Sequence, residues 1–195
     1  MSKSNTGDQI LSIACALLAS DGLGAVSFDA IAHRLGRSKQ AVLYWFPTKH
    51  DLLAAMFVPW LEAEADTAIS AVATATNQRE AIERFVRAIA LFHLGDLNRF
   101  RMMYLVPQTN KKPGKNRIDT DVVRKIHPVT DRLYGAFAGH LGADQNFGRK
   151  KAVAIHSSVL GLVLMFGLAD GLRDPLKHRE ADMIDTLIAS LTGKD

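Results

Sequence analysis

The fold of the first part of the chain is decided by the stretch Ser27-Phe-Asp-Ala-Ile-Ala-His-Arg-Leu-Gly-Arg-Ser-Lys-Gln-Ala-Val-Leu-Tyr-Trp-Phe-Pro-Thr-Lys-His-Asp-Leu-Leu53. It predicts two short helices joined by a tight turn and followed by the start of a third. We expect Ser27 and Ser38 to cap the two short helices, and Gly36 to end the first by adopting a positive φ. This pattern is typical of a helix-turn-helix, whose second helix usually enters the major groove of DNA.

The charge of this stretch also favours DNA. Between positions 33 and 50 the chain carries four cations, Arg34, Arg37, Lys39 and Lys49, and no carboxylate. The whole segment 1–53 has five cations and four carboxylates, so its net charge is only 5 − 4 = +1. The positive charge is therefore concentrated on the predicted DNA-binding face, where it can neutralise phosphates and release their counterions.

The motif Gly36-Arg-Ser-Lys-Gln-Ala-Val-Leu-Tyr-Trp-Phe46, with Thr48-Lys49 and Leu52-Leu53 after it, resembles the DNA-binding domain of the TetR family of transcriptional repressors. The preceding Ser27, Ile31-Ala32 and Leu35-Gly36 fit the same pattern, and the resemblance covers about the first quarter of the chain. One position departs from it. Leu43 stands where the family usually has a phosphate-contacting tyrosine, and a tyrosine follows one place later, at Tyr44.

The second helix of the motif is expected to read DNA. Lys39 and Gln40 lie at its N-terminal end, where glutamine can pair with adenine and lysine can donate to guanine. The other expected contacts are to phosphates or sugars, and for Trp45 the sequence leaves stacking and core packing equally open. The complete predicted set is Ser27, Arg37, Ser38, Lys39, Gln40, Tyr44, Trp45 and Lys49.

The rest of the chain shows helical periodicity and no sustained alternation typical of strands. A first helix is expected from a capping box formed by Thr6 and Gln9, and later helices at about 48–61, 79–94, 96–106, 119–141, 146–172 and 179–191. Residues 107–117 have the composition of a loop. The predicted fold is all-α with about nine helices: a three-helix DNA-binding domain at 1–53 and a larger helical effector-binding and dimerisation domain at 54–195.

Two features of the predicted C-terminal domain are interpreted through the family resemblance. Pro59 falls inside a helix that links the two domains in the family, so we hypothesise that it sets the angle between them; a break without regulatory meaning is the alternative. The run 159–169 is apolar on nearly all sides. The resemblance implies that the last two long helices form a four-helix bundle with a second copy; burial within one subunit is the alternative.

The resemblance also implies a small effector, mostly apolar, bound inside the second domain. Aromatic and methionine side chains with a few polar groups suit such a ligand. The candidate lining residues are Trp60, Phe92, His93, Phe100, Met103, Tyr104, His127, Tyr134, His156 and Met165.

Other function classes are less well supported. The chain has no Walker loop, no Gly-x-Ser-x-Gly and no His-Glu-x-x-His, so neither an enzyme nor a cofactor is expected. Its seven histidines show no i+3 or i+4 pairing, so no metal site is expected, although one assembled from distant helices, such as His93 with His127, stays open. The single cysteine, Cys15, and the absence of a signal peptide favour the cytoplasm.

The preferred interpretation is a homodimeric repressor that an effector releases from a palindromic operator. The alternative is a ligand-binding or protein-interaction module with weak or lost DNA binding, for which Leu43 is the best support.

Overall fold

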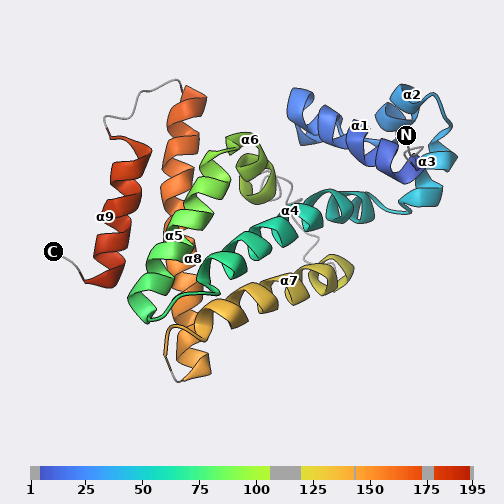
Figure 1. Cartoon of the computed structure of the whole chain (residues 1–195). Helices are drawn as coiled ribbons and strands as arrows, with labels where there is room; N and C mark the ends of the chain where they lie inside the picture. The colour runs from blue at the N-terminus through green and yellow to red at the C-terminus, as the bar shows by residue number, and fades with distance from the viewer. Residues whose placement is uncertain (1–4, 106–119, 143, 173–177, 194–195) are drawn as a thin grey trace, which may run out of the picture. The chain divides into compact units, whose positions relative to one another are not determined.

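The computed structural model describes residues 5–105, 120–142, 144–172 and 178–193 (Figure 1). Within these residues the chain is all-helical, as predicted, with nine α-helices and two short segments of other helix types. The loop predicted at 107–117 lies outside the described residues. The elements in chain order are α1 (Thr6–Asp21), η1 (Leu23–Ala25), α2 (Phe28–Leu35), α3 (Lys39–Trp45), α4 (Lys49–Val72), α5 (Gln78–Leu94), α6 (Leu97–Phe100), a π-helical turn η2 (Arg101–Leu105), α7 (Thr120–Ala138), α8 (Gln145–Leu172) and α9 (Glu180–Thr192).

The start signals of the N-terminal helices act as the sequence predicts, with one exception. Ser27 and Ser38 cap α2 and α3, accepting hydrogen bonds from the amides of Ala30 and Ala41 at 3.1 and 3.3 Å. The prediction that Thr6 caps α1 was wrong. Asn5 is the cap: its backbone is extended, and its Oδ1 accepts from the amide of Gly7 at 2.6 Å, while Thr6 is already helical.

Gly36 ends α2 in the left-handed conformation that the turn requires, with φ 66° and ψ 34°. A Cβ at this position would meet no atom within 4 Å, so a side chain here would cost conformational energy without a clash. The left-handed region is unfavourable for residues with a Cβ.

We expect Gly36→Ala to lower the free energy of unfolding by about 1–2 kcal/mol, because alanine is strained at this φ. Urea unfolding followed by circular dichroism would measure the change. Gly24→Ala is the matched control, because its Cβ would also meet nothing within 4 Å and its backbone is not left-handed. An equal effect of the two substitutions would contradict this account of the turn.

The chain divides into two compact units: Met1–Leu61 with Met102–Ile126, and Glu62–Arg101 with His127–Asp195. The first unit contains α1, α2 and α3, and its core is built from the apolar faces of these helices and the start of α4, namely Ile10, Ala14, Leu17, Leu18, Val26, Ile31, Ala32, Val42, Leu52 and Met56. Cys15 is half-buried against this core.

In the second unit α5 packs against both α8 and α9 (Figure 1). Its apolar stripe includes Ile82, Phe85 and Ile89, which are completely or almost completely buried. The Phe85 ring stacks on the Phe137 ring of α7, with centroids 4.0 Å apart. Helix α4 begins in the first unit and ends in the second, and it is continuous through Pro59, so this proline does not divide the helix.

Helix α8 contains the most apolar part of the chain. Among the described residues it is also the helix whose length and composition would allow it to cross a membrane, with a mean hydropathy of 2.0 over its most apolar window, a property that core helices share. Val159 and Val163 are completely buried, whereas Met165, Leu168 and Leu172 are 56%, 49% and 77% exposed. The described part of the chain therefore covers one face of this helix and leaves an apolar face near its C-terminal end exposed.

Candidate functional site

The predicted reading helix, α3, is held by one apolar side chain and by its cap. Val42 is completely buried in the core of the first unit, and Phe46, directly after the helix, packs on the same core. The opposite side of the helix and the turn before it consist of exposed side chains, Arg37, Ser38, Lys39 and Gln40. Lys49, at the start of α4, is exposed as well, and Ser27 is half-buried because it caps α2.

Lys39 has a partner inside the protein. Its Nζ lies 2.8 Å from Oδ2 of Asp29 on α2, and both side chains are at least half exposed. An exposed ion pair of this kind contributes roughly 0–1 kcal/mol. A guanine or a phosphate could therefore replace Asp29 as the partner of Lys39 at little energetic cost.

The structure distinguishes the two neighbours Leu43 and Tyr44. Tyr44 is 83% exposed, whereas Leu43 is half-buried. The phenol of Tyr44 is thus available to a partner, although sequence registration places the tyrosine of the family at position 43.

Trp45 has both an exposed part and a packed part. It is 41% exposed, and its ring is edge-on to Tyr44 with centroids 6.0 Å apart. The ring also lies against α1: a Cβ added to Gly7 would be 3.1 Å from Cε3 of Trp45. This close approach explains a glycine in the first turn of a helix, where it would otherwise be unfavourable.

The ten predicted pocket residues are not all in similar places. Four of them are buried, His93, Phe100, Met103 and His156, and four are half-buried, Trp60, Phe92, Tyr104 and Tyr134. The remaining two, His127 and Met165, are exposed. Trp60, Met103 and Tyr104 belong to the first unit and the others to the second.

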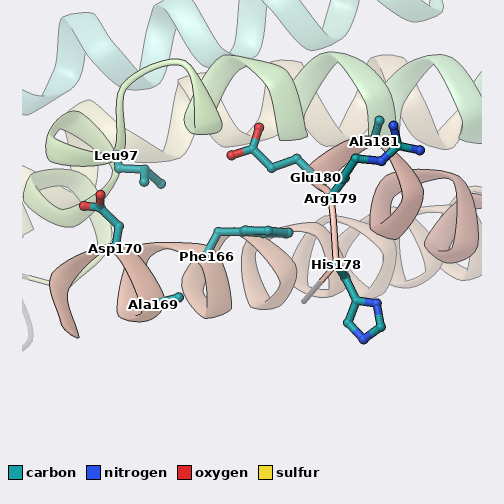
Figure 2. A pocket seen from close by; sticks show the side chains of 8 residues that line it. All are labelled: Leu97, Phe166, Ala169, Asp170, His178, Arg179, Glu180 and Ala181. Atoms are coloured by element: carbon teal, nitrogen blue, oxygen red, sulfur yellow. The ribbon is translucent and has the colours of Figure 1, made fainter. Parts of the chain in front are cut away.

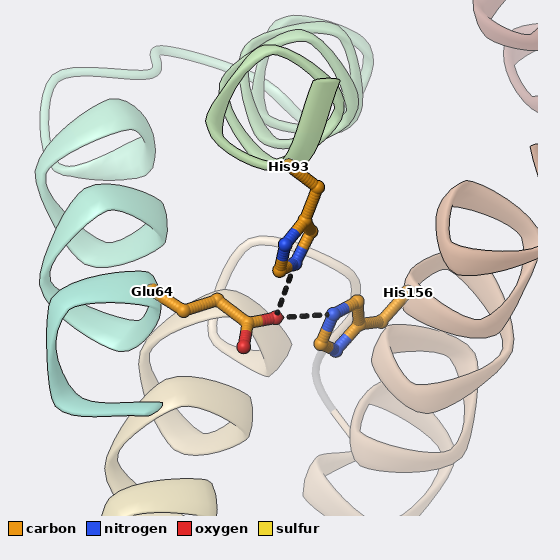
Figure 3. A group of neighbouring side chains, drawn as sticks. All are labelled: Glu64, His93 and His156. Carbon is orange, nitrogen blue, oxygen red and sulfur yellow. Dashed lines mark ion pairs between the residues drawn. The ribbon is translucent and has the colours of Figure 1, made fainter. Parts of the chain in front are cut away.

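Three buried polar side chains of the second unit converge on one point: Glu64 from α4, His93 from α5 and His156 from α8 (Figure 3). Oε1 of Glu64 lies 2.8 Å from Nε2 of His156 and 3.3 Å from Nε2 of His93. We call these three residues the Glu64 cluster. Nδ1 of His156 is 3.0 Å from the hydroxyl of Tyr134, which extends the hydrogen-bond network to α7.

The electrostatics of the Glu64 cluster favour an ionised carboxylate. Burial by itself would raise the pKa of Glu64, but hydrogen bonds and charge interactions with His156 and His93 outweigh it and lower the pKa to about 2. The carboxylate is 2% exposed. A buried charge of this kind needs a cationic partner, either a protonated histidine or a metal ion.

The sequence did not predict a role for Glu64. It offered His93 with His127 as an example of a metal site between distant helices, whereas the structure brings His93 together with His156. A signal was present: Glu64 shares the buried face of α4 with Ala65, Ala68 and Val72, and a carboxylate in an apolar stripe is unusual. The pairing of His93 with His156 had no local signal, because the two residues are on different helices.

A second feature of this unit is an open cavity of about 560 Å³. Figure 2 shows its lining, which comes from α6, the end of α8 and the start of α9: Leu97, Phe166, Ala169, Asp170, His178, Arg179, Glu180 and Ala181. None of the ten predicted pocket residues lines it. Asp170 on its wall is paired with Arg101 at 2.6 Å.

Comparison with protein families agrees with the helix-turn-helix. Residues 10–56 match the model of bacterial regulatory proteins of the tetR family. No curated protein matches the chain. The match spans α1, α2, α3 and the start of α4, which are the elements that build and support the exposed face described above.

Solved structures share the fold along nearly the whole chain. The fatty acid degradation regulator FadR from Bacillus halodurans is similar with a TM-score of 0.68, 18% identity and coverage of 98% of this chain and 97% of that chain. FadR from Bacillus subtilis, solved in complex with stearoyl-CoA, has a TM-score of 0.69 and 14% identity, and the match covers 96% of this chain and 98% of that chain. A TetR transcriptional regulator from Legionella pneumophila has a TM-score of 0.62 and 22% identity, and the match covers 97% of this chain and 98% of that chain.

A helix-turn-helix whose second helix exposes basic side chains defines a DNA-binding transcription regulator. Residues 10–56 carry the helix-turn-helix of the TetR family of bacterial regulatory proteins, as the resemblance at residues 27–53 predicted.

Proposed function

We propose that the chain is a homodimeric repressor that leaves a palindromic operator when a small, mostly apolar effector binds. Residues 1–53 would be the DNA-binding domain, and residues 54–195 the effector-binding and dimerisation domain. The proposal depends chiefly on one observation: the basic, carboxylate-free turn and N-terminal end of α3 expose Arg37, Ser38, Lys39 and Gln40 together. It assigns no enzymatic role and no cofactor, and it places the protein in the cytoplasm with its DNA.

The proposed contacts follow from the position of each side chain. Lys39 and Gln40, in the first turn of α3, would reach base edges in the major groove. Ser38, Tyr44 and Lys49 would bind phosphates, with further contacts from Ser27, Arg37 and Trp45. The 83% exposure of Tyr44 supports its replacing the contact that Leu43 lacks.

The open face of α8 supports dimerisation through α8 and α9. Ala154, Ser157, Gly161, Met165, Leu168 and Leu172 recur at helical spacing and are exposed in the protomer. Small residues in the first half of this face would let two helices approach closely, and the larger apolar residues in the second half would bury surface. Two-fold symmetry of the dimer implies operator half-sites about one helical turn apart, or a multiple of it.

We expect Leu168→Glu to shift the protein from dimer to monomer, because it would place a carboxylate at the centre of the proposed interface. Light scattering coupled to gel filtration would measure the mass. Leu91→Glu is the matched control, since Leu91 is also exposed, at 56%, but lies on α5. A dimer that persists with Leu168→Glu, or that Leu91→Glu dissociates, would contradict this interface.

The effector would act by binding one conformation of the dimer better than the other, and so change the spacing of the two reading helices. The relative from B. subtilis was solved with stearoyl-CoA, so a long-chain acyl-CoA is a reasonable first compound to test. The ten candidate pocket residues include buried aromatics such as Phe100 beside polar groups such as His93, which suits a mostly apolar ligand.

A mobility-shift assay tests the proposal. The probe is the DNA upstream of the gene that encodes the chain, measured at two salt concentrations, with and without stearoyl-CoA. A repressor of this kind should bind that DNA far better than a scrambled sequence, and more weakly at higher salt. Binding no tighter than to scrambled DNA would instead favour a ligand-binding or interaction module that has lost DNA binding.

A further inference from the structure

We propose that the Glu64 cluster is a binding site for one divalent first-row transition-metal ion, with Oε1 of Glu64, Nε2 of His93 and Nε2 of His156 as ligands and one position left open. The site would lie wholly within the second unit, so it is independent of whether the chain represses a gene. The ligand chemistry is that of zinc sites with two imidazoles, one carboxylate and a free fourth position for water or an added ligand.

The distances within the cluster suit such an ion. A tetrahedral ion with ligand distances of about 2.0–2.1 Å separates its ligand atoms by about 3.3 Å. The separation of Glu64 Oε1 from His93 Nε2 is 3.3 Å, and that from His156 Nε2 is 2.8 Å. All three ligand atoms lie within 4.8 Å of one another, so a small opening of the Glu64–His156 pair would accommodate the ion.

The orientation of the side chains is also that of metal ligands. Figure 3 shows both imidazoles directing Nε2 to the carboxylate from two different helices. On His156 the other ring nitrogen, Nδ1, is 3.0 Å from the hydroxyl of Tyr134. With a metal on Nε2, Nδ1–H would donate to this hydroxyl, which is the outer contact that fixes the tautomer and orientation of metal-bound histidines.

The surroundings would keep bulk water out and strengthen binding. Exposed fractions are 2% for Glu64, 0% for His93 and 4% for His156. The ring of Phe100 is edge-on to His93 with centroids 5.3 Å apart, and that of Phe85 is edge-on to His156 at 5.7 Å. A divalent ion here would offset the buried carboxylate charge without requiring a protonated histidine.

Binding would join three helices that are distant in sequence. Glu64 is in the C-terminal half of α4, His93 near the end of α5 and His156 near the middle of α8. An ion that holds these helices together stabilises the folded state over the unfolded chain, where the three ligands are not assembled.

The test uses the full-length, tag-free protein after removal of metal with a chelator. Co²⁺ is titrated in and followed by its visible absorption, and Zn²⁺ is then added as a competitor. We expect about one Co²⁺ per chain, an absorption intensity typical of four-coordinate cobalt, complete displacement by Zn²⁺, and a rise in Tm of about 5–10 °C at 100-fold excess over Kd.

Variants identify the ligands. His93→Gln and His156→Gln should weaken Co²⁺ binding at least 100-fold, and Tyr134→Phe, which removes only the outer hydroxyl, by roughly 10- to 100-fold. His178→Gln is the matched control, because His178 is an exposed histidine of the same unit outside the cluster, and this variant should bind Co²⁺ like the unmodified chain.

Absence of Co²⁺ binding by the unmodified chain, or equal binding by His93→Gln and His156→Gln, would overturn the proposal and leave the cluster as a carboxylate held by two histidines. Circular dichroism checks that the variants are folded. Should both ligand variants fail to fold, Tyr134→Phe decides alone, and unchanged affinity in this variant would likewise overturn the site.

Discussion

Replacing Lys39 or Gln40 with alanine is expected to weaken binding to the operator by about 1–3 kcal/mol each, which is about 5- to 150-fold in Kd. The reason is geometric. Both residues occupy the first turn of α3, both are exposed, and side chains at this end of a reading helix contact base edges. Binding to scrambled DNA should change much less, because base-edge contacts contribute only on the correct sequence.

The contrast with Lys49 makes this prediction specific. Lys49→Ala should weaken binding to operator and scrambled DNA alike, because a lysine at the start of α4 would neutralise phosphate charge without reading sequence. The slope of the logarithm of the binding constant against the logarithm of salt concentration should fall in magnitude by about 1, as for the loss of one phosphate contact. Lys150→Ala, an exposed lysine on α8, controls for the general loss of a cation. Fluorescence anisotropy on both DNAs at several salt concentrations measures the Kd of each variant for each DNA and its salt dependence.

One detail of the structure sharpens the interpretation of Lys39→Ala. The substitution also removes the ion pair with Asp29, which is exposed and worth little. Asp29→Asn should therefore leave operator affinity unchanged or raise it slightly, because it frees Lys39 without removing it. If Lys39→Ala and Asp29→Asn weakened operator binding equally, the ion pair and not base reading would explain the effect of position 39.

The largest stability change is expected for Phe85→Ala, at about 3–5 kcal/mol. Phe85 is completely buried on α5, and its ring is nearly parallel to that of Phe137, with centroids 4.0 Å apart and an interplanar angle of 4°. Truncation loses the transfer free energy of the ring and leaves a cavity in the second unit. Such a loss is a large fraction of the 5–15 kcal/mol that typically stabilises a folded protein.

Urea unfolding at one fixed protein concentration measures this effect, because the proposed dimerisation would make apparent stability depend on concentration. Phe147→Ala is the matched control: Phe147 is 62% exposed at the start of α8, so its truncation should cost under about 0.5 kcal/mol. A loss below about 1 kcal/mol for Phe85→Ala would mean that the core of the second unit is not built around this stack.

Much of the N-terminal unit could be predicted from the sequence because its signals are local. Ser27, Gly36 and Ser38 act within four residues of their own positions, and the structure confirms all three. The error at Thr6 has the same origin, since Asn5 and Thr6 are both acceptable caps and only the backbone conformation distinguishes them. Helix α4 is continuous through Pro59, although a proline removes one hydrogen bond from a helix interior, so the residue type alone did not decide whether the helix divides there.

The two candidate sites, the exposed face of α3 and the Glu64 cluster, also differ in how far local sequence signals could predict them. The exposed residues of α3 could be chosen from the sequence because a helix-turn-helix places them by helical period alone. The histidines of the second unit could not be paired, because no local spacing relates His93 on α5 to His156 on α8.

The sequence by itself determined the all-helical class, the helix-turn-helix and its likeness to the tetR family, since caps, periodicity and motif spacing act over a few residues. Only the tertiary structure decided that Tyr44 is exposed while Leu43 is half-buried, that Lys39 pairs with Asp29, and that Glu64 meets two histidines. These outcomes depend on how separate helices pack, and the free energy of packing arises between residues that the chain order leaves far apart.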